Sequence, residues 1–243
     1  WDSGDYSTHT LNTEGVTDEN RHHVENTRDL YGAAVDYLDR QVCDLADWLH
    51  ANTQRETTLV VTADHGENLG YSADEELLAH KGVLTEGLLH VPLLVLNAPE
   101  VDAGLNESQY VSHLALGEFL VGLANGKVPD PTTERIPAER IGSNMADDAS
   151  AEDRAEWDRM IRVVYDGEVK YQWDSEAERL RYRLDANRPN WQERVDSKVP
   201  VADLEPAFFD SPLLKYKREA RDRAADVTMD DATQDRLEDL GYM

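Results

Sequence analysis

The sequence is poor in cysteine, in lysine and in long apolar runs. Its single cysteine, Cys43, excludes a disulfide within the chain. No apolar run approaches the roughly 20 residues that a membrane-spanning helix requires. Only six of the 24 basic residues are lysines, and the 50 acidic residues bring the formal net charge to −26. Because this charge repels other polyanions, we expect neither nucleic acid nor a membrane surface as a partner.

A dense acidic surface with few lysines is typical of proteins adapted to high salt, where screening removes most of the self-repulsion. The alternative is an acidic protein from an ordinary environment. A melting series across salt concentrations separates the two, since maximal stability in dilute buffer would contradict salt adaptation. Apolar residues make up 40% of the chain and fall in periodic blocks, which predicts a folded protein.

An amphipathic helix and a buried strand are predicted in the N-terminal half. Asn26 or Thr27 is the expected N-cap of a helix that runs to about His50. Thr57–Ala63 is apolar and β-branched without alternation, as expected of a central strand buried on both faces. Helix followed by buried strand indicates an α/β fold. The helix has one apolar face, predicted to pack on a sheet, formed by Tyr31, Val35, Leu38, Val42, Leu45 and Leu49.

Three further elements are predicted before a boundary near residue 130. Residues 70–80 form a polar loop with a helical turn, Pro92–Leu96 a second buried strand, and Tyr110–Ala124 another helix. Prolines then interrupt the pattern, and we divide the chain into an α/β core over 1–130 and a small C-terminal subdomain over 131–243. The interrupting residues are Pro129, Pro131 and Pro137.

The C-terminal part has the pattern of an antiparallel meander of three or four strands. Asp166-Gly167 is a strong hairpin signal, and Asp174–Glu178 offers a second, looser turn. The tail from Ser211 is charged and helical in bias. The strand-like runs are Ile161–Tyr165, Val169–Trp173 and Leu180–Leu184.

Candidate metal ligands lie at the end of the first predicted strand. Asp64 and His65 follow it directly and precede Gly66, and ligands of open α/β sheets gather at the carboxyl ends of strands. A carboxylate and an imidazole can both bind a divalent cation, provided that the chain turns so that adjacent side chains reach one ion. The alternative is a turn-capping Asp64 and a surface His65. Glu67 could support these ligands from behind or be merely exposed, and we expect it to be exposed.

A candidate anion-binding residue follows in the next polar loop. Lys81 lies between His80 and Gly82, and a lone lysine in so acidic a chain suggests a counter-charge for an anionic group of a substrate. Its ammonium could hold a sulfate or phosphate oxygen and stabilise charge that develops on a leaving group. The alternative is an ordinary surface lysine.

Three segments together resemble the second half of a sulfatase, a family within the alkaline-phosphatase-like superfamily. The segments are Thr62–Gly70 (TADHGENLG), His80–Glu86 (HKGVLTE) and Val91–Leu93 (VPL), and the flanking helices and hairpin fall in family order. The combination is more specific for the superfamily than for sulfatases within it. With the acidic composition, the sequence resembles the C-terminal portion of a sulfatase from a salt-adapted, haloarchaeal-type source.

The resemblance implies a partial alkaline-phosphatase-like sandwich, in which helices flank a mixed sheet, with a small C-terminal antiparallel-sheet subdomain. It implies that Asp64 and His65 bind a divalent cation, calcium in preference to manganese or zinc. It makes Lys81 the residue that contacts the substrate sulfate, with His80 beside it as a second catalytic candidate. The implied substrate is a small-molecule or carbohydrate sulfate ester.

Several family features are missing from these 243 residues. There is no Cys-x-Pro-x-Arg motif to supply a formylglycine nucleophile, no pair of aspartates to complete the metal site, and no His-x-Pro-Tyr segment. The chain begins at Trp1 rather than Met, and we interpret it as a C-terminal fragment that is inactive alone. The alternatives are a phosphodiesterase, phosphonate hydrolase or phosphoglycerol transferase of the same superfamily, or a non-catalytic member.

Overall fold

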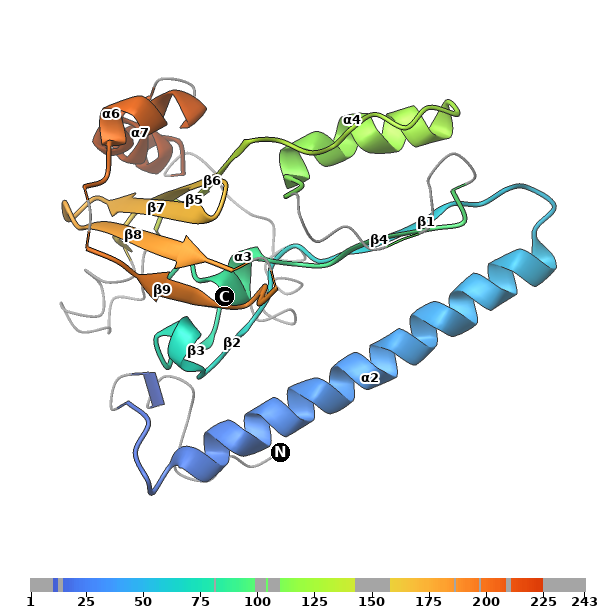
Figure 1. Cartoon of the computed structure of the whole chain (residues 1–243), viewed down its shortest axis with the longest axis horizontal. Helices are drawn as coiled ribbons and strands as arrows, with labels where there is room; N and C mark the ends of the chain where they lie inside the picture. The colour runs from blue at the N-terminus through green and yellow to red at the C-terminus, as the bar shows by residue number, and fades with distance from the viewer. Residues whose placement is uncertain are drawn as a thin grey trace.

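The computed structural model of the chain describes residues 11–12, 15–80, 82–98, 104, 110–142, 158–185, 187–196, 198–208 and 211–224. These residues form a mixed α/β structure of helices and small antiparallel sheets (Figure 1), which confirms the predicted fold class. None of the helices in these ranges combines the length and the apolarity needed to cross a membrane.

The long helix α2 spans Arg21–Asn52 and is largely exposed. Its N-cap is Asn20, so the predicted caps at Asn26 and Thr27 are wrong. At its N-terminal end, Arg28 donates to the carbonyl oxygens of residues 69 and 70 at 2.8 and 2.6 Å. Farther along, α2 extends as a single helix set apart from the other elements (Figure 1). The predicted packing of its apolar face on a sheet is therefore wrong, since Leu38 is 59% exposed.

Strands β1 (Leu59–Thr62) and β4 (Leu93–Leu96) pair antiparallel in a two-stranded sheet. Both were predicted as strands, but the prediction that they are buried on both faces is wrong. Within the described residues no third strand joins them, and Leu94 is 43% exposed. The predicted helix after them is confirmed as α4 (His113–Ala124), which begins where the Ser112 hydroxyl accepts the backbone N–H of residue 114.

A small hairpin and two short helices occupy the segment between β1 and β4. Strands β2 (Asn68–Leu69) and β3 (Leu78–Ala79) pair antiparallel. The 3-10 helix η1 (Ser72–Asp74) lies between them, which confirms the helical turn predicted in this loop. Helix α3 (Glu86–Leu89) follows and leads into β4.

The C-terminal part contains a five-stranded antiparallel sheet in which every strand pairs with the next along the chain. The predicted turns are confirmed, since Gly167 adopts a φ of 59° between two strands and Asp174 accepts two backbone N–H groups in the second turn. The meander has five strands, whereas three or four were predicted. Its strands are β5 (Arg135–Arg140), β6 (Ile161–Asp166), β7 (Val169–Asp174), β8 (Arg179–Leu184) and β9 (Gln192–Arg194).

Both faces of this sheet bury apolar side chains. One face, with Val164 and Trp173, is covered by α6 (Val201–Leu204), η2 (Glu205–Phe208) and α7 (Leu213–Ala224). The helix α7 confirms the helical bias predicted from Ser211 as far as residue 224, and the rest of the tail lies outside the described residues. The opposite face packs against the segment around α3 through Leu84 and Leu89. The predicted boundary at residue 130 stays a prediction, and Val111 forms a β-bridge across it to Thr132.

Candidate metal centre

The chain turns directly after β1, and this turn brings Asp64 and His65 together. One carboxylate oxygen of Asp64 accepts the backbone N–H of His65 at 2.9 Å, and the other lies 3.9 Å from His65 Nε2. The adjacent side chains therefore do not point to opposite faces, as they would on an extended strand. Two donor atoms at this separation can bind the same divalent cation.

Gly66 fixes the position of this turn against helix α3. Its backbone N–H donates to the carbonyl oxygen of Leu88 at 2.8 Å. A Cβ atom at Gly66 would lie 2.0 Å from the carbonyl oxygen of Gly87, so only glycine allows so close an approach. The loop that carries Asp64 and His65 is thus attached to α3 through its own backbone.

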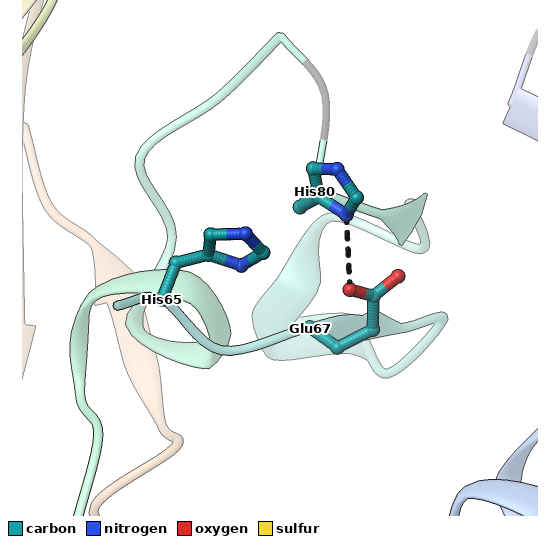
Figure 2. Close-up of side chains that lie close together, drawn as sticks. All are labelled: His65, Glu67 and His80. Atoms are coloured by element: carbon teal, nitrogen blue, oxygen red, sulfur yellow. Dashed lines mark hydrogen bonds and ion pairs between the residues drawn. The ribbon is translucent and has the colours of Figure 1, made fainter. Parts of the chain in front are cut away.

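Glu67 and His80 lie opposite each other at the open end of the β2–β3 hairpin. The register pairs Asn68 with Ala79, which brings the residues just outside that pair into contact. His80 Nδ1 lies 3.1 Å from a carboxylate oxygen of Glu67. The His65 ring lies beside that of His80, tilted by 34°, with centroids 4.6 Å apart (Figure 2).

Buried polar contacts hold the hairpin in place. Asp74 is buried and accepts the backbone N–H groups of Leu69 and Tyr71 at 3.0 and 3.3 Å. Burial raises the pKa of its carboxyl, although these two hydrogen bonds oppose the shift. Glu75 accepts the hydroxyl of Tyr182 in β8 at 2.8 Å. The hairpin is thereby connected to the five-stranded sheet.

A buried ion pair connects α3 to the same sheet. Glu86 is 1% exposed, and its carboxylate lies 2.9 Å from Nζ of Lys170, which is fully buried in β7. Tyr165 donates to the same carboxylate at 2.7 Å. Burial lowers the pKa of Lys170 while Glu86 opposes the shift, and burial together with Glu86 raises the pKa of Tyr165.

The structure thus brings three of the four predicted site residues into one region. Asp64 and His65 lie together, and His80 contacts the ring of His65. Lys81 lies outside the described residues. The expectation that Glu67 is exposed is wrong, because its side chain is 27% exposed and pairs with His80. The sequence signal that could have found it is its place two residues after His65.

The donor set fits a divalent cation. His65 Nδ1 lies 2.7 Å from the carbonyl oxygen of Gly66, and a carbonyl oxygen only accepts, so this hydrogen bond assigns the ring proton to Nδ1. The tautomer leaves the lone pair on Nε2, which lies 3.9 Å from a carboxylate oxygen of Asp64. Since His65, Glu67 and His80 each add a donor atom within 4.8 Å of the other two, both carboxylate and imidazole ligands are present.

Comparison with known proteins identifies the family of the chain. A search of curated proteins finds no significant match. The family model described as Sulfatase matches residues 1–126, a span that includes β1, the β2–β3 hairpin, α3 and all the residues of the candidate site. Sulfatases generally use a divalent metal, and a His/Glu cluster is present in this chain. On this match over more than half of its length, the chain belongs to the sulfatase family.

Proposed function

We propose that this chain carries the metal- and sulfate-binding side of a sulfuric ester hydrolase. The observation that carries the proposal is the approach of Asp64 to His65 at the end of β1, in a chain that belongs to the sulfatase family. Family membership supports hydrolysis of sulfate esters as the reaction class. A small-molecule or carbohydrate sulfate ester is the proposed substrate.

In this proposal Asp64 and His65 bind one divalent cation, and calcium is the first choice. Calcium takes six to eight oxygen ligands, so two residues are only part of its coordination shell. The bound ion would act as a Lewis acid on an ester oxygen. Lys81 would hold a sulfate oxygen by a charge-assisted hydrogen bond, and His80 beside it is the second catalytic candidate.

We also propose that these 243 residues alone do not hydrolyse a sulfate ester. Hydrolysis through a covalent intermediate requires a nucleophile, and the sequence contains no Cys-x-Pro-x-Arg motif. Cys43 is exposed on α2, an element that contributes none of the candidate site residues. The acidic composition supports the further proposal of a salt-adapted source.

A phosphoryl-transfer enzyme of the same superfamily is the second candidate. The observation that favours it is the presence of a second imidazole, since the ring centroids of His65 and His80 lie 4.6 Å apart. Imidazole ligands suit zinc better than they suit calcium. A phosphodiesterase, phosphonate hydrolase or phosphoglycerol transferase would use the same lysine against a phosphoryl oxygen.

Calorimetric titration of the chain with inorganic sulfate, in the presence of calcium, tests the first proposal. Lys81→Ala should weaken sulfate binding at least about tenfold, because a hydrogen bond to a charged group contributes about 1.5–3 kcal/mol. Lys215→Ala is the matched control, since Lys215 is 62% exposed on α7. Equal sulfate affinity in the two variants would contradict the role of Lys81.

Two further measurements on the same samples separate the alternatives. Tighter binding of inorganic phosphate than of sulfate would favour the phosphoryl-transfer candidate. An aryl sulfate should not be hydrolysed by the chain alone. Turnover that disappears in Lys81→Ala would contradict the proposed inactivity.

A further inference from the structure

A second donor set overlaps the candidate site but leaves Asp64 out. His65, Glu67 and His80 each offer one ligand atom, and these atoms lie within 4.8 Å of one another. In the part of the chain that the structure describes, no other three histidine, cysteine or acidic side chains meet this condition. The set consists of two imidazoles and one carboxylate, which differs in chemistry from the oxygen-rich shell that calcium requires.

Three separate backbone positions bring these side chains together. His65 follows β1, Glu67 precedes β2 and His80 follows β3. Figure 2 shows the three side chains close together. The hairpin register places Glu67 opposite His80, and the hydrogen bond from Gly66 to α3 fixes the turn that carries His65. The arrangement therefore rests on backbone contacts and does not require an ion to assemble it.

The burial of the three side chains suits a site that exchanges ions with solvent. Their exposed fractions are 35% for His65, 27% for Glu67 and 31% for His80. An ion can thus enter from solution while part of its surroundings excludes water. A cation shared by Glu67 and His80 would take the place of the proton in their 3.1 Å hydrogen bond.

We propose that His65, Glu67 and His80 form a binding site for a zinc-class divalent ion. Two histidines and one glutamate, with a fourth position left open, form a ligand set that zinc adopts in tetrahedral sites. Donor atoms around tetrahedral zinc lie about 3.3 Å apart, so the set contracts modestly when the ion binds. Imidazole ligands favour zinc over calcium and magnesium. Because His65 can bind only one ion at a time, this ligand set is an alternative to the Asp64–His65 calcium site proposed above, and it does not depend on sulfate-ester hydrolysis.

Competition of the full chain with a chromophoric chelator for zinc alone, with calcium alone as the comparison, tests this site. We expect one zinc ion per chain, bound at least about 100-fold more tightly than calcium, a difference of about 2.7 kcal/mol. Glu67→Gln and His80→Ala should each weaken zinc binding at least about tenfold. Glu67→Gln keeps the shape of the side chain, so it tests the carboxylate even if His80→Ala disturbs the hairpin.

Two further variants decide which residues hold the ion. Asp64→Asn should weaken zinc binding less than Glu67→Gln does, because Asp64 is not one of the three proposed ligands. His90→Ala should have no effect, because His90 lies outside the set and its Nδ1 contacts the carbonyl oxygen of Pro189 at 2.7 Å. Loss of zinc binding in Asp64→Asn but not in Glu67→Gln would assign the ion to Asp64 and His65 and overturn the proposal. Equal affinity of the chain for zinc and calcium would also overturn it.

Discussion

The five-stranded sheet buries apolar side chains on both of its faces, whereas α2, β1, β4 and α4 leave much of their apolar surface exposed. Met160, Val164 and Leu204 on one face and Ile161 and Val163 on the other are at most 2% exposed. The helices α6 and α7 cover the first face and the segment around α3 covers the second. The C-terminal sheet therefore has the larger hydrophobic core among the described residues.

The N-terminal elements have apolar patterns of the same kind without the same burial. On α2, Tyr31 is 42% exposed and Leu45 is 45% exposed. On α4, Leu114 is 76% and Val121 is 64% exposed. Since burial, and not spacing, contributes the hydrophobic free energy, these faces contribute little to the stability of the described structure.

The comparison shows on which region the candidate site depends. The turn with Asp64 and His65 is attached to α3 through Gly66, and α3 is attached to the sheet through the buried pair of Glu86 and Lys170. The sheet thus supports the site from outside the span that the family model matches, which ends at residue 126. Variants in the two regions test this difference in support.

The largest effect is expected from Lys170→Met. It leaves Glu86 charged and buried without its ammonium partner, and removal of one member of a buried pair costs about 3–5 kcal/mol. The measurement is the free energy of unfolding from urea titrations at constant salt. Lys215→Met is the matched control, because the pair of Lys215 with Glu219 is exposed at 62% and 44% and such pairs contribute at most about 1 kcal/mol. Equal losses in the two variants would contradict the role of the buried pair.

The second-largest effect is expected when a buried leucine is replaced by alanine, in comparison with the same change at an exposed leucine. Leu204→Ala in α6 opens a cavity beside Trp173 and Phe208 and should cost about 2–5 kcal/mol. Leu38→Ala on α2 should change the free energy of unfolding by less than about 0.5 kcal/mol, because Leu38 is 59% exposed. The same urea titrations measure both. A comparable loss in Leu38→Ala would show that the apolar face of α2 is covered in solution.

Local chemistry explains which parts of the fold could be predicted from the sequence. Gly167 and the side-chain acceptor of Asp174 fix two turns, and the strands that they connect follow. The strand β5 was missed because Pro137 was expected to interrupt the chain, whereas it lies within β5 and pairs with Val164. The strand β9 was missed because Gln192–Arg194 is short and polar, and only pairing with β8 makes it a strand. For α2, apolar spacing identified one face but carried no information on whether another element covers it.

The candidate site was predictable in part for the same reason. Asp64 and His65 follow an apolar strand, so their place at its end could be read from the sequence alone. Glu67 was missed because the hairpin strands that place it opposite His80 are two residues long, too short to show a period. The pair of Glu86 and Lys170 joins residues far apart in the chain, and no local pattern indicates such a contact.

Native-state hydrogen exchange at the Gly66 amide tests most directly whether the sheet holds the candidate site. This amide donates to the carbonyl oxygen of Leu88, so it should exchange as slowly as the amides of β6 and β7 and far more slowly than those in the exposed part of α2. Lys170→Met should accelerate exchange at Gly66 and leave α2 unchanged. Exchange at Gly66 as fast as in α2, or unaffected by Lys170→Met, would show that the sheet does not hold the candidate site.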